Sequence, residues 1–358
     1  MCGICGIIKL KGNLDNQDLY AMEEMFLAIE SRGNDASGIA YINNKGYLTI
    51  DRHPIKARQF IKTEPWKKFK QERPNIVIAH TRLATTGHQD RNRNNHPQPS
   101  LDKKMALVHN GVIFNHLSVS QKFSLPRRAD VDTEVIMRLI ERADGDLMAK
   151  IQSATSHLRG SYAVALLNQD EPDYLYLWRY NNPIHVAYLA ENDAILFASE
   201  EYNVAVGMLC YSPAYSKKAN EPFKTLRPRI NAISLEEGQI FRIGRGTASL
   251  FEKQKFTANA SYTYSSLCRT GNEDPWEEDE PDLYKSYPSK PHQYSSSNSK
   301  NTPYTPKTWN IHYRCYSCSR TTVKLGQERW RLTYTFPCED DCPGWYEATG
   351  YTGPLMDL

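Results

Sequence analysis

The second residue of the chain, Cys2, combines two groups that could carry out covalent chemistry. Removal of Met1 is usual when the second residue is small, and it would leave a thiol beside its own α-amino group. An α-amino group has a pKa of about 7.7 to 8.0, so near physiological pH it can take the thiol proton without help from a histidine. The alternative is that Cys2 is a small buried residue at the start of a strand.

A series of polar and glycine-rich motifs follows Cys2. In order along the chain they are Cys2-Gly3-Ile4-Cys5-Gly6-Ile7, SRGNDASG (31–38), HTRLATTG (80–87), Asn95-His96-Pro97, HNGVIFN (109–115), Asp132-Thr133-Glu134 and LEEG (235–238). This order resembles the class II glutamine amidotransferases, which are N-terminal-nucleophile (Ntn) hydrolases, and among them the glutaminase domain of the glucosamine-6-phosphate synthases. The resemblance covers about the first 250 residues, and so many ordered motifs make a chance match improbable.

The resemblance implies a role for each matching residue. Cys2 would attack the side-chain amide of L-glutamine and form a γ-glutamyl thioester, releasing ammonia and then glutamate. Asn110, through its side-chain amide, and Gly111, through its backbone N–H, would stabilise the oxyanion. Arg82 would bind the α-carboxylate and Asp132 the α-ammonium group, because each carries the opposite charge. A backbone contact at Thr85 would complete substrate binding.

Arg32 matches an arginine close to the nucleophile, where its charge would hold the chain terminus and neighbouring carbonyl groups. The alternative for Arg32 is a buried structural ion pair with Asp35. Leu83 and Thr86 depart from the aromatic residue and the histidine that the sugar-phosphate amidotransferases usually have. These departures leave hydrolysis intact, but they predict looser closure of this loop over the site.

The loop that follows carries His88, Arg91 and Arg93, which are interpreted as solvated polar side chains.

Apolar runs predict the elements that position these motifs. Strand-like runs cover 5–10, 76–80, 106–109, 163–167 and 195–198, and helical spacing covers 19–29, 135–140 and 147–158. Helices laid over a substantial sheet indicate an α+β domain, and the resemblance implies the four-layer αββα Ntn-hydrolase sandwich. We place this glutaminase domain at residues 2–253.

Residues 254–308 are rich in Ser, Tyr, Pro and Asn, and this composition predicts a disordered linker. Seven of the ten residues from Glu273 to Asp282 are acidic, which is usual for a solvated charge run and less often a docking segment.

Four cysteines in the tail, residues 309–358, have the spacing of a zinc site. Cys315 and Cys318 are separated by two residues, nineteen residues follow, and Cys338 and Cys342 are separated by three. Two close pairs in so short a segment predict a structural zinc ribbon, with free or oxidised thiols as the alternative. Such a ribbon could bind a protein or nucleic acid.

The bulk properties set limits on the function. A net charge of +3 over 358 residues gives no electrostatic reason to expect nucleic acid or membrane as the main partner. The chain has neither a long apolar run nor a signal-peptide pattern, and the cysteine spacing favours a reducing compartment, so we expect a cytoplasmic protein.

Two hypotheses of function follow. The first is a glutaminase, needing no cofactor for catalysis, that supplies ammonia to an acceptor enzyme on a separate chain, in amino-sugar or nucleotide-related metabolism. A separate chain is expected because the tail is too short for the acceptor domain that the family normally carries. The second is a catalytically idle adaptor on the same fold, whose zinc ribbon binds a partner protein or nucleic acid.

Overall fold

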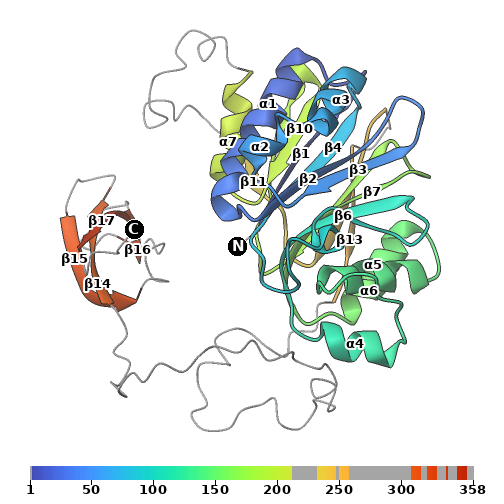
Figure 1. Ribbon diagram of the computed structural model, residues 1–358. Coiled ribbons are helices and arrows are strands. Elements are labelled where there is room, and N and C mark those ends of the chain that lie inside the picture. Colours follow the sequence, from blue (N-terminus) through green and yellow to red (C-terminus); the bar gives the residue numbers. More distant parts are fainter. Residues whose placement is uncertain are drawn as a thin grey trace. The chain divides into compact units, whose positions relative to one another are not determined.

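The computed structural model describes residues 2–211, 232–246 and 250–257, together with the backbone of four strands between residues 308 and 352. The chain divides into two compact units, Met1–Asp274 and Pro275–Leu358 (Figure 1).

Seven antiparallel strands form the first sheet of unit 1, in the order β11-β9-β10-β1-β4-β2-β3. Their bounds are β1 Gly3–Lys9, β2 Ala36–Ile42, β3 Leu48–His53, β4 Ile76–Arg82, β9 His185–Leu189, β10 Ala194–Ala198 and β11 Ile233–Ser234. The N-terminal strand β1 lies in the middle of this sheet and is hydrogen-bonded to β10 on one side and β4 on the other. Every residue of β1 and β4 is buried, which explains their continuous apolar runs.

Six antiparallel strands form the second sheet, in the order β13-β12-β8-β7-β6-β5. Their bounds are β5 Gln98–Pro99, β6 Met105–Ile113, β7 Gly160–Asn168, β8 Tyr174–Tyr180, β12 Gln239–Gly244 and β13 Phe251–Lys255. The two longest strands, β6 and β7, pair in register from Met105 opposite Asn168 to Ile113 opposite Gly160.

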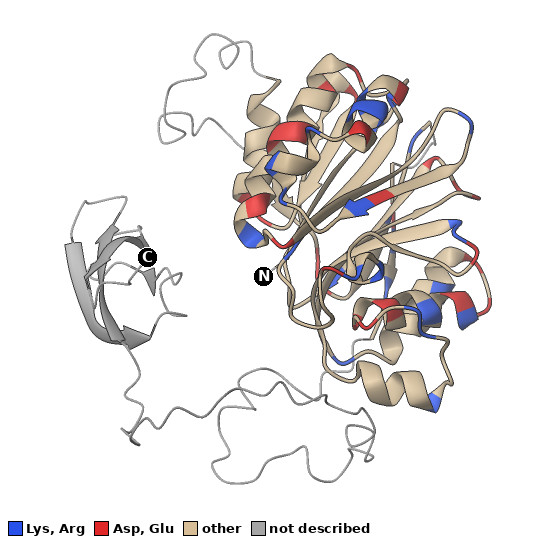
Figure 2. Cartoon of the chain, viewed as in Figure 1, with Lys and Arg blue, Asp and Glu red and all other residues tan. Residues whose placement is uncertain are grey.

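Helices cover the outer face of each sheet (Figure 1). On the first sheet lie α1 Asn16–Ala28, α2 Ala57–Phe60, α3 Glu64–Glu72 and α7 Glu201–Leu209. On the second lie α4 His116–Lys122, α5 Thr133–Arg142 and α6 Leu147–Ser156. Lys, Arg, Asp and Glu lie mostly on the helices and loops, whereas the strands are mostly uncharged (Figure 2).

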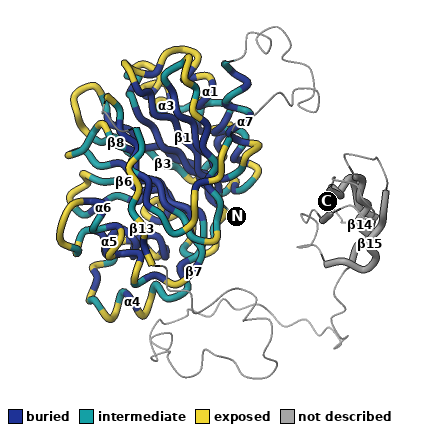
Figure 3. Tube along the Cα trace, turned by 180° about the vertical axis from the view of Figure 1, so that it is seen from behind, coloured by how far each residue is buried: buried dark blue, intermediate teal, exposed yellow. Residues whose placement is uncertain are grey.

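Three apolar layers stabilise this arrangement, and the buried segments stand out in Figure 3. One layer packs α1, α2, α3 and α7 against the first sheet, and within it Trp66 of α3 stacks on Phe26 of α1 with ring centroids 5.3 Å apart. A second packs α4, α5 and α6 against the second sheet. The third lies between the sheets and includes Ile4 and Val108. The order is helices, sheet, sheet, helices, as expected from the sequence.

The elements predicted from apolar patterns agree with the structure. The five strand-like runs lie in β1, β4, β6, β7 and β10, and the three helical patterns correspond to α1, α5 and α6. The other strands of the two sheets were not predicted, among them β2 and β3. Of these, β3 is only partly buried along its whole length, so its sequence lacks a strong apolar alternation.

Unit 1 continues past residue 253, where we placed the end of the glutaminase domain. The last strand of the second sheet, β13, ends at Lys255, and the buried Phe256 packs against Tyr162 with ring centroids 6.3 Å apart. The rest of the expected linker, from residue 258 to 307, and with it the acidic run 273–282, lies outside the described residues.

Unit 2 contains a four-stranded antiparallel sheet in the order β15-β14-β17-β16. Its strands are β14 Thr308–Cys315, β15 Thr321–Glu328, β16 Phe336–Pro337 and β17 Trp345–Thr352. Cys315 is the last residue of β14, whereas Cys318, Cys338 and Cys342 lie outside the described residues, so the zinc ribbon stays a prediction.

Over the part of the chain for which a structure is described, no helix is both long and apolar enough to cross a membrane.

Candidate active site

Cys2 stands directly before the central strand β1, at the end where β4 finishes. Its thiol donates to the backbone carbonyl of Leu83, with Sγ and O 3.6 Å apart. The chain approaches its neighbours closely here: a Cβ atom on Gly3 would lie 2.8 Å from the Cβ atom of Ile29 and 2.9 Å from the hydroxyl of Thr81. Glycine at position 3 therefore allows the start of β1, and with it Cys2, to pack closely against Ile29 and Thr81.

The electrostatic surroundings of Cys2 favour the protonated thiol. Burial by the surrounding protein raises the pKa of the Cys2 thiol above its ordinary value, and the negative charge of Asp132 adds to this effect. The positive charge of Arg82 lowers the same pKa. A thiol in this position needs a nearby base to become a nucleophile, and the α-amino group of a chain that begins at Cys2 would supply one.

Arg32 holds the backbone of the nucleophile. Its Nε donates to the carbonyl oxygen of Cys2 at 2.8 Å, and its Nη1 forms an ion pair with Glu200. The side chain of Arg32 is 9% exposed. This contact agrees with the sequence-based role of holding carbonyl groups next to the nucleophile. Asp35, the alternative partner considered for Arg32, accepts a hydrogen bond from the backbone N–H of Ala84 at 2.8 Å.

Asn110 and Gly111 follow one another on β6. The backbone carbonyl of Asn110 accepts a hydrogen bond from Asn182 Nδ2 at 2.9 Å, whereas its side-chain Nδ2 is buried with no hydrogen-bond partner among the described residues. An unpaired buried donor is costly unless a ligand uses it. Gly111 has φ +148°, and a Cβ atom there would lie 1.9 Å from the carbonyl oxygen of Ser161, so only glycine fits.

Asp132 lies at the N-cap of α5 and is 6% exposed. One carboxylate oxygen accepts from the backbone N–H of Thr133 at 2.9 Å, and the other accepts from the backbone N–H of Ile113 at 2.7 Å. Since Ile113 ends β6, Asp132 is fixed directly to the strand that carries Asn110. The oxygen that accepts from Ile113 keeps a lone pair for an ammonium group.

The loop before Asp132 is folded around the buried carboxylate of Glu134. Its oxygens accept from the backbone N–H groups of Arg128 and Ala129, with distances of 2.8 to 3.0 Å, and form an ion pair with Arg138 at 3.0 Å. The glutamate of the Asp132-Thr133-Glu134 motif therefore fixes the backbone of the loop that leads to Asp132.

Arg82 ends β4 and is 2% exposed. Its Nη2 donates to the carbonyl oxygens of Thr86 and Gly87 at 2.5 and 2.6 Å, and its Nη1 donates to Asn95 Oδ1 at 2.8 Å. These three bonds leave two of its five N–H groups, on Nε and Nη1, for a carboxylate. In this structure Arg82 therefore holds its own loop in addition to facing the site.

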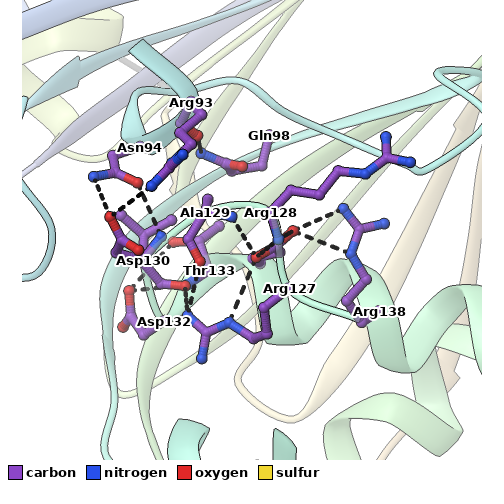
Figure 4. A network of polar contacts seen from close by, with 12 residues as sticks. Arg93, Asn94, Gln98, Arg127, Arg128, Ala129, Asp130, Asp132, Thr133 and Arg138 are labelled. Carbon is purple, nitrogen blue, oxygen red and sulfur yellow. Dashed lines mark hydrogen bonds and ion pairs between the residues drawn. The ribbon is translucent and has the colours of Figure 1, made fainter. Parts of the chain in front are cut away.

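The loop that follows Arg82 forms the rim of the site. Leu83 is 40% exposed, and Thr85 is also exposed. Asn94 and Asp130 join this loop to the loop before Asp132. The backbone N–H of Asp130 donates to Asn94 Oδ1 at 2.9 Å, and Asn94 Nδ2 donates to the Asp130 carboxylate at 3.2 Å (Figure 4).

A contact between the two sheets brings β6 next to the nucleophile. His80 of β4 pairs with Ile4 of β1, and its Nε2 lies 3.1 Å from the carbonyl oxygen of His109 on β6. Because Asn110 is the next residue, the oxyanion donors lie at the same end of the sandwich as Cys2. The residues named for the site from sequence thus gather around the start of β1, and their catalytic roles stay predictions.

Sequence reasoning missed several residues of this site. Glu200 precedes α7 far along the chain, and no motif marks it as the partner of Arg32. His80, His96 and His109 stand inside the recognised motifs, yet no role was assigned to them. Their motif positions were the signal that could have directed attention to them.

The comparisons with known proteins agree with this arrangement. Residues 80–205 match the family model described as "Glutamine amidotransferase domain". Glutamine–fructose-6-phosphate aminotransferase (isomerizing) from Fusobacterium nucleatum is 33% identical over 190 residues, which cover 52% of this chain and 30% of that protein. The same enzyme from Shouchella clausii is 32% identical over 234 residues, covering 63% and 36%. The chain spans about a third of the length of these relatives.

Among solved structures, glutamine phosphoribosylpyrophosphate amidotransferase from B. subtilis is similar in fold. The TM-score is 0.52 with 21% identity, over 72% of this chain and 50% of that chain.

Two antiparallel sheets between helical layers, with a cysteine at the head of the central strand, define an Ntn-hydrolase fold. Within that class, residues 80–205 of this chain match a glutamine amidotransferase domain, and the chain is similar over more than half of its length to the glutamine–fructose-6-phosphate aminotransferases.

Proposed function

We propose that this chain hydrolyses L-glutamine to glutamate and ammonia, with Cys2 as the nucleophile. The observation that carries this proposal is the buried side-chain Nδ2 of Asn110, which has no partner among the described residues and stands beside Gly111, whose positive φ suits only glycine. A neutral donor left without a partner is what a transient oxyanion requires. The charged groups of Arg82 and Asp132 support glutamine as the substrate, since a free amino acid carries both opposite charges.

The proposed reaction proceeds in two halves. The α-amino group of Cys2 takes the thiol proton while sulfur forms a bond to the amide carbon, and the carbonyl oxygen becomes an oxyanion between Asn110 Nδ2 and the N–H of Gly111. Collapse breaks the C–N bond, and the leaving nitrogen takes the proton and departs as ammonia. Water then attacks the thioester, which gives glutamate and restores the thiol.

The direct test measures glutamate and ammonia released from L-glutamine by the full chain, with Cys2→Ala as the control. We expect turnover that Cys2→Ala abolishes while thermal unfolding stays unchanged. Intact-mass measurement should show that the active protein begins at Cys2. An active protein that retains Met1 would overturn the free-amine mechanism, and absence of turnover would favour the idle adaptor.

We further propose that the ammonia is used by an acceptor enzyme on a separate chain and that the tail, residues 309–358, serves this partnership. Truncation after Thr257, which keeps β13 and Phe256, should leave hydrolysis of glutamine nearly unchanged and weaken ammonia transfer to the acceptor that co-purifies with the chain. Loss of glutaminase activity on this truncation would contradict the division of roles.

The zinc proposal for Cys315, Cys318, Cys338 and Cys342 has its own measurement. Metal analysis of protein purified under reducing conditions should find one zinc per chain, lost when Cys315 and Cys318 are both changed to serine. Metal-free protein would contradict it.

A further inference from the structure

Three histidines are buried together where β4, β6 and α5 meet. His80, His96 and His109 are each at most 4% exposed, and the rings of His80 and His96 stack with centroids 4.1 Å apart. The hydroxyl of Thr133 lies 2.9 Å from His96 Nε2 and 2.8 Å from His109 Nδ1. One hydroxyl on the first residue of α5 therefore contacts two imidazole rings from two other segments.

These contacts match the hydrogen-bonding capacity of the groups. Burial lowers the pKa of His80 to about 3 and lowers the pKa of His96 and of His109, so the three rings are neutral near pH 7. A threonine hydroxyl has one proton and two lone pairs, so its oxygen can accept a hydrogen bond from one N–H of each ring at once. It also lies 3.4 Å from Asp132 Oδ1, to which it can donate.

We propose that Thr133 is a positioning residue for glutamine hydrolysis. Its hydroxyl fixes His109, and with it the strand that bears the oxyanion donors, relative to Asp132. Thr133 follows Asp132 directly and His109 precedes Asn110 directly, so this one contact joins the ammonium-binding carboxylate to the oxyanion donor. The inference rests on the proposed glutaminase function and deepens it.

The same contact extends to the carboxylate-binding side of the site. His96 follows Asn95, whose side chain accepts from Arg82, and the ring of His96 stacks on His80 of the strand that Arg82 ends. The hydroxyl of Thr133 is thus connected to Asp132, to the strand that carries Asn110 and, through His96, to Arg82, without being assigned a contact with the substrate itself.

The test removes the hydroxyl of Thr133 and keeps a β-branched side chain of similar size. Thr133→Val leaves two buried ring nitrogens without their partner, and we expect kcat to fall about 10- to 100-fold, because a shift of about 1 Å in catalytic groups has an effect of this order. Thr133→Ser keeps the hydroxyl and should restore most of kcat. If Thr133→Val does not fold, Thr133→Ala makes the same deletion without added bulk.

Thr155 provides a matched control. It is another fully buried threonine, on α6, and its hydroxyl donates to the carbonyl oxygen of Gln152 at 2.9 Å. Thr155→Val should lower the thermal unfolding temperature to a similar extent as Thr133→Val and leave kcat and KM unchanged.

A double-mutant cycle separates positioning from general destabilisation. If Thr133 acts through the oxyanion donor, Thr133→Val should have a much smaller effect on kcat when Asn110 is already alanine. Equal effects in both backgrounds, or an unchanged kcat in Thr133→Val, would overturn the inference. If the wild-type chain itself does not release ammonia from glutamine, the proposed function fails and this inference fails with it. An active wild type with a fully active Thr133→Val refutes the role of Thr133 alone.

Discussion

Replacing Asn110 by alanine tests the catalytic assignment most directly. Its side-chain Nδ2 has no partner among the described residues, and its backbone carbonyl keeps the bond from Asn182 in any variant. Deleting the amide therefore removes no protein hydrogen bond made by Nδ2, and we expect the free energy of unfolding to change by less than about 1 kcal/mol.

The effect on the reaction should be much larger than the effect on stability. Loss of one oxyanion donor costs about 100- to 1,000-fold in kcat, which corresponds to about 2.7 to 4 kcal/mol of transition-state stabilisation. The KM for glutamine should change little, because the oxyanion does not exist in the bound substrate. A protein that is stable but slow is the expected result for Asn110→Ala.

The assay combines steady-state release of glutamate with thermal unfolding of the same preparation. Asn203 on α7 offers a matched control, since it is fully buried and both polar atoms of its side chain lack hydrogen-bond partners in the described part of the chain. Asn203→Ala should leave kcat unchanged. The reasoning is refuted if Asn110→Ala raises KM with kcat intact, or if its loss of activity only follows a loss of folded protein.

Three further outcomes are expected. Asp132→Asn keeps an oxygen to cap α5 but removes the charge, so the KM for glutamine should rise at least about 10-fold with kcat less affected; equal changes in both would contradict a binding role. Glu200→Gln should lower kcat/KM while sparing stability, because Arg32 then loses the charge that orients it toward the Cys2 carbonyl; unchanged kinetics would show that Arg32 needs no such partner. The buried histidines should weaken the fold in acid. The pKa of His80 is about 3 in the folded protein and about 6.5 when unfolded, so the unfolded chain alone takes up protons as the pH falls below about 6.5. Each such histidine can lower the free energy of unfolding by up to about 1.4 kcal/mol per pH unit, and denaturant titrations at pH 7.5 and 5 that gave the same stability would exclude this.

The sequence predicted the main strands and helices because apolar patterns are local, whereas the four-layer arrangement was implied by the family resemblance. Cys2 could be identified from its own thiol and α-amino group, whereas the roles proposed for Asn110 and Asp132 came from the motifs that carry the resemblance. Apolar runs in β1 and β4 are continuous because both faces of these strands are buried.

What could not be predicted depends on contacts between distant segments. The ion pair between Arg32 and Glu200 spans 168 positions, and no periodicity or motif connects them. The use of Arg82 to hold the carbonyl oxygens of its own loop follows from how that loop turns back. Strand β13 continues to Lys255, past the boundary placed at 253, and Phe256, a single aromatic residue in a polar stretch, packs into the core.

The central position of β1 has a consequence for the mobility of the chain terminus. The first residues of a domain usually fray and exchange their amide hydrogens rapidly. Here the backbone N–H of Ile4 donates to Ser199 Oγ at 2.9 Å, its carbonyl accepts from the N–H of Ser199 at 2.9 Å, and strands flank β1 on both sides. Amides only two residues beyond the nucleophile should therefore exchange as slowly as those of the core. Cys2 would then be held still by the least mobile part of the sheet, and its orientation would be lost only when the whole unit unfolds.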